Sequence, residues 1–174
     1  MMDPAIVLVV RLAVATLFAL AAWHKLREWP RIGGVIAGYR IVPEWAAVPI
    51  ARVLIVLEFG VAVGALVTPQ ALLGAALLLL TYAAAMGINI ARGNDRIDCG
   101  CNAFGTSGPG LVWPMVIRNT TIALIAVGAS VHSAPTRSLV WVDRLTAVFA
   151  LLVLCVLYAS LESNFALPKK GARK

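Results

Sequence analysis

The chain has 174 residues, of which 61% are hydrophobic and only 13% are charged, and its mean hydropathy is +0.89. This composition excludes an ordinary soluble globule and indicates an integral membrane protein. The formal net charge of +7 does not indicate nucleic acid as a partner, because part of it lies in a short basic tail, residues 168–174, that follows a hydrophobic run. We expect residues 1–167 to form a single transmembrane domain and the tail to lie near anionic lipid on the cytoplasmic side.

The hydrophobic residues fall into runs of the length that crosses a bilayer, which takes about 20 mostly apolar residues as helix. The runs are continuous and rich in Leu, Ala and Val, without the alternation of a barrel strand. No positively charged segment precedes the first run, so we expect it to be a retained helix rather than a cleaved signal. We therefore predict an all-α integral membrane protein, a bundle of about five transmembrane helices. The five runs are Pro4–Trp23, Ala46–Val67, Ala71–Ile90, Leu111–Val131 and Leu139–Leu161.

The segment Lys25–Trp45, between the first two runs, is too short and too charged to span the membrane. Its apolar residues Ile32, Val35, Ile36 and Tyr39 have the spacing i, i+3, i+4, i+7 of one helix face. This pattern predicts a short amphipathic helix that lies in the membrane interface and covers one end of the bundle.

Successive transmembrane helices alternate in direction, so several polar or reactive residues are expected at the same membrane surface. Three further polar positions and one cysteine fall within or near that leaflet. We therefore expect any functional site to lie at this end of the bundle. The residues at the surface are His24, Lys25, Tyr39, Asp98, Cys99, Cys101 and Trp113, and those within the leaflet are Glu58, Arg118, Asn119 and Cys155.

Glu58 is the most informative single residue, because it lies about three turns into the second apolar run. A carboxylate near the bilayer centre costs about 2.5–3.5 kcal/mol on insertion scales, so such residues face the bundle interior with a partner. Arg118 has a similar expected depth and is the partner that the sequence predicts. The pair could simply hold two helices together, or it could form a polar floor that holds or relays a proton. Arg11, in the opposite leaflet, is expected to extend toward its own membrane surface and has no predicted role.

Two of the three cysteines lie one residue apart, in the sequence Asp98-Cys99-Gly100-Cys101 within the only long polar segment. A structural zinc site commonly pairs its ligands with Cys-x2–4-Cys spacing, which this motif does not have. We therefore expect no metal. Two unreactive loop cysteines are an alternative that the sequence leaves open.

A disulfide between Cys99 and Cys101 fits the motif better than a metal site does. The two Cα atoms must lie about 4.4–6.8 Å apart, so the chain has to turn between the cysteines, and Gly100 permits that turn. Such a small ring is strained, and strained, exposed disulfides are the ones that exchange readily. The motif therefore favours a redox pair.

Several motifs together resemble the MauE branch of the DoxX-like membrane proteins. The resemblance covers roughly residues 20–120, and the cysteine motif is its most specific part. The family's usual motif is Cys-Gly-Cys-Phe-Gly, whereas this chain has Asn102 and Ala103 inserted before Phe104. The matching motifs are WHKL at the end of the first run, Tyr39 with Val42 and Pro43, Glu58 with Gly60, ARGNDRIDCGCNAFG after the third run, and Arg118 with Asn119.

The resemblance implies a redox-associated protein of the cell membrane, with a four-helix core similar to that of vitamin K epoxide reductase relatives. It implies support of disulfide formation and maturation of an exported protein such as methylamine dehydrogenase, together with a thioredoxin-like partner. Cys99 and Cys101 would be the exchanging pair. The resemblance also suggests a quinone as cofactor, although the sequence has no signature for one. We expect supporting roles for the polar residues around the pair: His24, Lys25, Glu58, Asp98, Arg118 and Asn119.

Two lines of reasoning conflict over the orientation in the membrane. Disulfide chemistry for exported proteins belongs on the outer face, whereas basic residues mark the cytoplasmic face. The charge count places the cysteine loop inside. The basic residues on the side of that loop are Lys25, Arg27, Arg31, Arg40, Arg92, Arg96, Lys169, Lys170, Arg173 and Lys174, against Arg137 on the other side.

Two other functional classes remain open. One is a non-catalytic membrane scaffold for a redox complex, with structural cysteines. The other is a transporter that uses Glu58, which is less consistent with the sequence because transporters usually have several polar positions and broken helices.

Overall fold

The computed structural model describes residues 2–94, 111–132 and 138–166, and these form an all-helical structure. Each of the first four predicted runs is a helix that is long and apolar enough to cross a membrane, so the multi-pass helical prediction is confirmed. Arg118 and Asn119 belong to the fourth of these spans. The predicted interfacial segment between the first two spans also contains a helix. The helices are α1 (Pro4–Arg27), α2 (Trp29–Gly38), α3 (Glu44–Val67), α4 (Ala71–Ala91), α5 (Trp113–Val131) and α6 (Trp141–Ala166).

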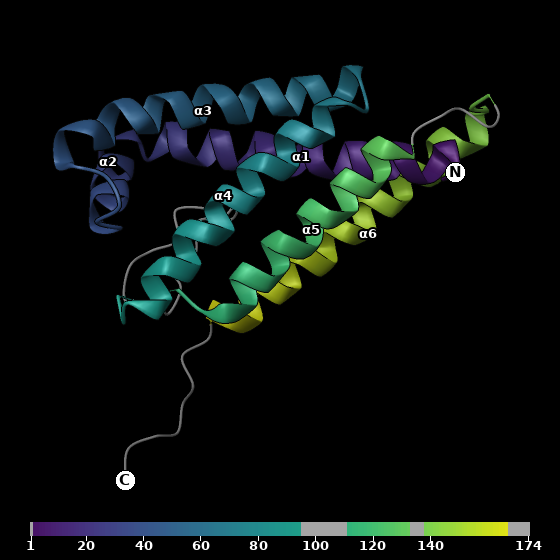
Figure 1. Cartoon of the computed structure of the whole chain (residues 1–174). Coiled ribbons are helices and arrows are strands. Elements are labelled where there is room, and N and C mark those ends of the chain that lie inside the picture. The colour runs from purple at the N-terminus through teal and green to yellow at the C-terminus, as the bar shows by residue number, and fades with distance from the viewer. Residues whose placement is uncertain (1, 95–110, 133–137, 167–174) are drawn as a thin grey trace, which may run out of the picture.

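The four spans form a closed bundle of two helix pairs. α1 runs beside α3, and α4 runs beside α5 at an angle to the first pair (Figure 1). Contacts between α3 and α4 and between α1 and α5 close the bundle. Gly64 near the end of α3 makes the α3–α4 turn tight, because a Cβ at this position would lie only 3.0 Å from the Cβ of Ala71.

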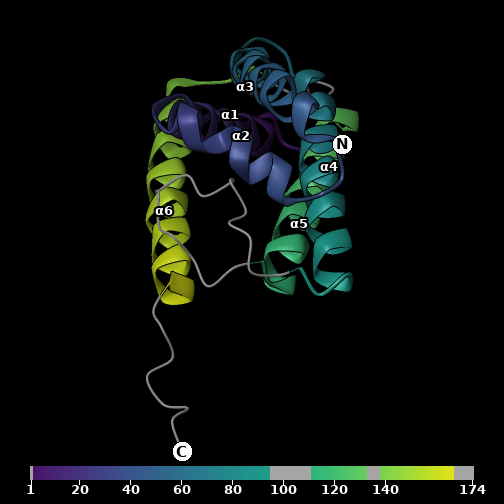
Figure 2. The same cartoon turned by 90° about the vertical axis from the view of Figure 1, so that its left-hand side faces the viewer.

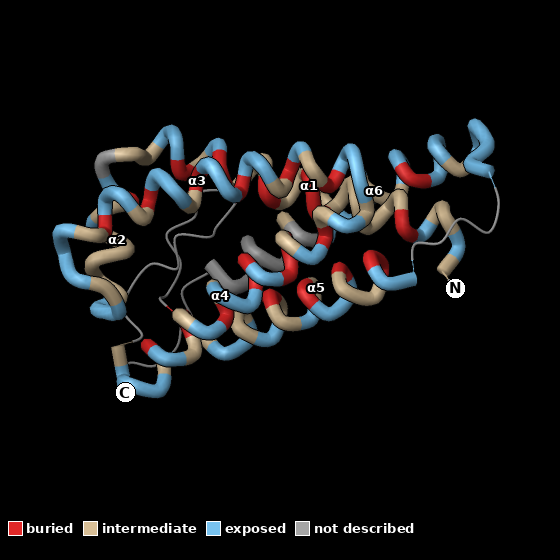
Figure 3. Tube along the Cα trace, turned by 45° about the horizontal axis from the view of Figure 1, so that its top comes forward, coloured by how far each residue is buried: buried red, intermediate tan, exposed pale blue. Residues whose placement is uncertain are grey.

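Small residues dominate the interior of the bundle. Close approach through small side chains is the usual way in which membrane helices pack, because lipid provides no hydrophobic driving force between them. The buried positions lie on the facing sides of the helices (Figure 3), while large apolar side chains such as Val56 and Leu77 project outward, as lipid contact requires. The alanines with no exposed surface are Ala22, Ala65, Ala75, Ala126 and Ala129.

The fifth predicted run is also helical, but α6 packs differently from the other long helices. Among the described helices it contacts α1 alone, and it stands apart from α4 and α5 (Figure 2). Among the described helices, four are long and apolar enough to span a membrane: α1, α3, α4 and α5. The role of α6 as a fifth transmembrane helix therefore remains a prediction.

The predicted interfacial helix is α2, and it folds back against the start of α3. Gly33 allows this approach, because a Cβ there would lie 3.1 Å from a methyl group of Val48. The predicted apolar face of this helix points inward, because Ile32 is buried and Val35 and Ile36 are partly buried. α2 therefore covers one end of the bundle.

One prediction about the segment Lys25–Trp45 is wrong. α1 does not end at Trp23 but continues to Arg27, so Lys25 belongs to the end of α1 rather than to the following loop. It continues the buried face formed by Phe18 and Ala22, at the helical spacing i, i+4, i+7. Lys25 is thus an interior residue and does not count among the surface charges that set the orientation.

Candidate functional site

A buried ionic cluster joins α1, α3 and α4. The Lys25 Nζ atom donates a hydrogen bond to Glu58 Oε1 at 2.6 Å, and the Tyr82 hydroxyl donates to the same oxygen at 2.6 Å. The Lys25 ammonium also lies 5.4 Å from the centre of the Tyr82 ring, within the range of a cation–π interaction. We call Lys25, Glu58 and Tyr82 the charged cluster.

The charged cluster is almost fully removed from solvent. Glu58 has no exposed surface, and Lys25 is 4% exposed. Two isolated charges would be very costly at such a position, whereas a short, hydrogen-bonded pair offsets most of that cost. The second carboxylate oxygen, Glu58 Oε2, is buried and has no hydrogen-bond partner among the described residues. It is therefore an available hydrogen-bond acceptor.

The prediction that Arg118 pairs with Glu58 is wrong. Among the described helices, α5 packs against α4 and α1 and not against α3, so equal depth does not bring the two side chains together. The Arg118 Nε and Nη2 atoms instead lie 3.4 Å from Oδ1 of the neighbouring Asn119, which is itself buried.

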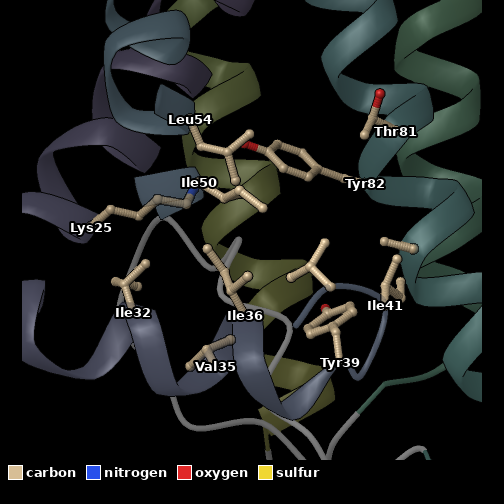
Figure 4. Close-up of a pocket in the computed structure, with 12 residues that line it drawn as sticks. Lys25, Ile32, Val35, Ile36, Tyr39, Ile41, Ile50, Leu54, Thr81 and Tyr82 are labelled. Atoms are coloured by element: carbon tan, nitrogen blue, oxygen red, sulfur yellow. The ribbon is translucent and has the colours of Figure 1, made fainter. Parts of the chain in front are cut away.

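A chamber of about 200 Å³ lies between α2, α3 and α4, next to the charged cluster. Lys25 and Tyr82 extend toward one another from opposite sides of it, and the α2 side chains Ile32 and Ile36 close it at the other end (Figure 4). Tyr39 supplies a second aromatic ring. The chamber is therefore almost entirely apolar, and Lys25 is the charged residue among the described residues that line it.

The cysteine segment begins from a rigid helix end. α4 ends in a Schellman arrangement, with Gly93 at φ +70°, the Gly93 amide donating to Ile90 O at 3.0 Å and the Asn94 amide donating to Asn89 O at 2.9 Å. Glycine is favoured at this position because its φ is positive. The Asn94 side-chain amide also donates to Gly38 O at 3.2 Å and to Asn89 Oδ1 at 3.0 Å. Asn94 thereby ties the start of the segment to the end of α2.

The first described residue after the cysteine segment also packs near the chamber. This residue, Leu111, is 3% exposed and forms a small core with Met86. Tyr39 and Tyr82 pack against this core. The end of the segment is therefore fixed beside Tyr82 and the chamber, and its start is fixed to the end of α2, next in the chain to the chamber residue Tyr39.

The structure groups only some of the predicted site residues. Cys99, Cys101 and Asp98 lie outside the described residues. His24 is half-buried one position before Lys25, and its Nε2 atom lies 3.9 Å from Glu28 Oε1. Cys155 lines a separate apolar cavity of about 410 Å³ between α1, α5 and α6. Within the described part of the chain, no three His, Cys, Asp or Glu residues group as metal ligands would.

Sequence reasoning missed Tyr82 and the asparagine pair Asn89 and Asn94. A polar residue on an otherwise apolar helix face was the available signal: Tyr82, Met86 and Asn89 recur at i, i+4, i+7. The role of Arg11 was also missed. Its Nε and Nη2 atoms donate to the carbonyls of Ala65 and Leu66 at 2.7 and 2.6 Å, and so satisfy the C-terminal end of α3.

A comparison with known protein families shows which family the chain belongs to. The family model for methylamine utilisation protein MauE matches residues 3–132, which include all four spans and both anchors of the cysteine segment. The chain belongs to the MauE family.

Curated MauE proteins are similar over most of their length. The chain is 40% identical to the methylamine utilization protein MauE of Paracoccus denitrificans over 130 residues, which is 73% of this chain and 69% of that protein. It is 36% identical to that of Paracoccus versutus over 171 residues, covering 97% and 91% of the two chains. The protein from Methylophilus methylotrophus is 29% identical over 169 residues, covering 95% and 89%.

No solved structure matches the chain. The expected likeness to vitamin K epoxide reductase relatives therefore remains a prediction.

Proposed function

We propose that this MauE family member is a thiol–disulfide exchanger of the cell membrane that uses Cys99 and Cys101. In this role it supports disulfide formation and maturation of an exported protein of methylamine utilisation, together with a thioredoxin-like partner. The family match supports the link to methylamine utilisation. The redox step is our inference from the Cys-Gly-Cys motif.

The anchoring of the cysteine segment is the observation that carries the proposal. Asn94 at its start is bonded to Gly38, and Leu111 at its end is packed with Met86 against Tyr39 and Tyr82. A rigid scaffold that presents a reactive segment is the usual arrangement for functional loops.

In the proposed exchange, two electrons and two protons pass from the thiols of the partner to the cysteine pair. A partner thiolate attacks one sulfur of the Cys99–Cys101 disulfide, which breaks that bond and forms a mixed disulfide. The second partner thiolate then attacks the mixed disulfide. The partner leaves with a disulfide, and the two electrons and two protons of its thiols reside on Cys99 and Cys101. Glu58 Oε2, which has no hydrogen-bond partner among the described residues, is the acceptor that the charged cluster offers.

Substitution of the cysteines tests the proposal against the scaffold alternative. Cys99→Ser and Cys101→Ser, singly and together, should abolish maturation of the exported protein and leave membrane insertion unchanged. Cys155→Ser is the matched control, because that residue lies in a different cavity, and it should retain maturation. Full maturation in the double variant would show that the protein is a scaffold with dispensable thiols.

The face on which the exchange occurs is tested separately, on the Cys155→Ser background. Intact cells are treated with a membrane-impermeant maleimide polymer, with and without prior reduction. We expect Cys99 and Cys101 to be labelled only after reduction and without lysis, as an outward-facing disulfide would be. Labelling that needs lysis but no reductant would place a reduced pair in the cytoplasm and would refute an exchanger for exported proteins.

A further inference from the structure

We infer that the chamber between α2, α3 and α4 binds a small lipid-soluble cyclic carbonyl compound, with the carbonyl oxygen accepting a hydrogen bond from Lys25. The site goes beyond the proposed exchange of disulfides and does not depend on Cys99 or Cys101. Three features carry the inference: the Lys25 donors that have no hydrogen-bond acceptor among the described residues, the aromatic and apolar walls, and the position of the opening.

Lys25 supplies the specificity. An ammonium group has three N–H donors. Within the described part of the chain, Lys25 donates one hydrogen bond, to Glu58, although its side chain is 4% exposed and lines the chamber. Buried donors normally find an acceptor, so the remaining N–H groups favour a ligand that carries one. Because Glu58 already balances the positive charge, an uncharged acceptor such as a carbonyl oxygen suits the site better than a second carboxylate.

The walls of the chamber determine which ligands fit apart from their carbonyl group. The rings of Tyr39 and Tyr82 and the aliphatic side chains of Ile36 and Leu54 surround a volume of about 200 Å³, which is large enough for a compact ring system (Figure 4). The apolar lining does not suit a sugar or a peptide, because their polar groups would lose hydrogen bonds there. A ligand pocket of this kind is lined mainly by apolar and aromatic groups, with few polar groups that fix the orientation.

The chamber opens toward the lipid. Thr81 and Ile41 line it and are exposed at its edge. The neighbouring α3 residue Val53 and the α4 residue Leu77 are exposed by 56% and 68%, and both belong to membrane spans. Leu54 lies about 15 Å from the start of α3 at 1.5 Å per residue, so we expect this side of the chamber to face the hydrocarbon region. The ligand therefore reaches the chamber from the bilayer.

Quinones are the redox-active members of this class, and the residues fit them: Lys25 can bond a ring carbonyl, and the tyrosine rings flank a flat ring. When bound, a quinone would supply an acceptor for the two electrons that the proposed exchange leaves on the cysteine pair. The wall that contains Tyr39 is also the one against which Leu111, at the end of the cysteine segment, is packed.

The test uses two probes of the same shape, 1-tetralone and tetralin, of which only the first has a carbonyl group. Equilibrium binding is measured with the full chain in lipid nanodiscs, and empty nanodiscs correct for partition into lipid. We expect 1-tetralone to bind at least about tenfold more tightly, as one hydrogen bond from a charged donor predicts. Equal affinity for the two probes would refute recognition by Lys25. Duroquinone should displace 1-tetralone, and a failure to do so would remove quinones from the ligand class.

Matched variants locate the binding. Leu54→Trp should fill the chamber and weaken binding of both probes by more than about tenfold, whereas Leu57→Trp, on the outward side of the same helix, should have no effect. If both variants bind like the wild type, the probes bind elsewhere and the inference is wrong.

Removal of the donor needs a variant that folds. Lys25→Met combined with Glu58→Leu removes both charges at once, and it should abolish the preference for 1-tetralone while tetralin binding persists. The same measurements on the Cys99→Ser, Cys101→Ser protein should be unchanged. Failure of the disulfide-exchange proposal would therefore leave this test intact.

Discussion

Lys25 and Glu58 lie 33 positions apart in the chain and form a 2.6 Å ion pair inside the bundle, between the end of α1 and the middle of α3. The pair fixes the relative rotation of the two helices, because each charge is tolerated only where the other compensates it. Tyr82 adds a hydrogen bond from α4, so three of the four spans meet at one carboxylate oxygen. The core of Met86 and Leu111, at one anchor of the cysteine segment, packs against Tyr82 of this cluster.

The first prediction concerns the ion pair. Glu58→Gln leaves the Lys25 charge buried without a counter-charge and should lower the free energy of unfolding by about 3–5 kcal/mol. Lys25→Met together with Glu58→Leu removes both charges and should recover most of that loss. Thermal unfolding in detergent measures both effects. A double variant that is destabilised as much as Glu58→Gln, or more, would show that the two residues do not act as a pair.

The second prediction isolates the Tyr82 hydroxyl. Tyr82→Phe keeps the ring and removes the hydrogen bond to Glu58, so we expect a loss of about 1.5–3 kcal/mol, typical of a hydrogen bond to a charged group. Thr81→Val is the adjacent control, because the Thr81 hydroxyl bonds only the carbonyl of Leu77 on its own helix and is exposed. It should change stability by less than about 0.5 kcal/mol. Equal effects of the two substitutions would contradict the assigned bond.

The third prediction concerns the helix end that starts the cysteine segment. Gly93→Ala forces a Cβ into a positive φ and should cost about 1–2 kcal/mol, with faster hydrogen exchange of the Asn94 amide. Gly87→Ala on the same helix meets no atom within 4 Å and should be neutral or stabilising. Hydrogen exchange monitored by mass spectrometry measures the exchange rate of the Asn94 amide in both variants. Unchanged exchange at Asn94 in the Gly93 variant would rule out the Schellman arrangement as the anchor.

The fourth prediction concerns the opposite end of the bundle. Arg11→Met removes the donors to the Ala65 and Leu66 carbonyls and should lower stability by about 1.5–3 kcal/mol. Arg52→Met removes a cation–π contact with Trp29, 5.6 Å from ring centre to guanidinium, and should cost less, about 0.5–1 kcal/mol. Unfolding in detergent compares the two. A smaller loss for Arg11→Met than for Arg52→Met would mean that α3 does not depend on these bonds.

The sequence by itself determined the helical membrane architecture, because apolar runs of bilayer length are a local property of the chain. It also determined the short helix α2, whose apolar face is readable from the spacing of Ile32, Val35 and Ile36. The cysteine motif carried the family resemblance, which the family match confirms. Glu58 was recognised as an interior residue from its depth alone.

Only the tertiary structure decided which residue meets Glu58. The sequence favoured Arg118 because the two residues have similar depth, but depth does not fix which helices are neighbours or how they are rotated. α3 packs against α1 and α4, so Glu58 meets Lys25 and Tyr82. The structure also shows that α1 continues past Trp23 to Arg27, which brings Lys25 to Glu58. Partner choice among buried charges is a property of three-dimensional packing, and local sequence patterns do not contain it.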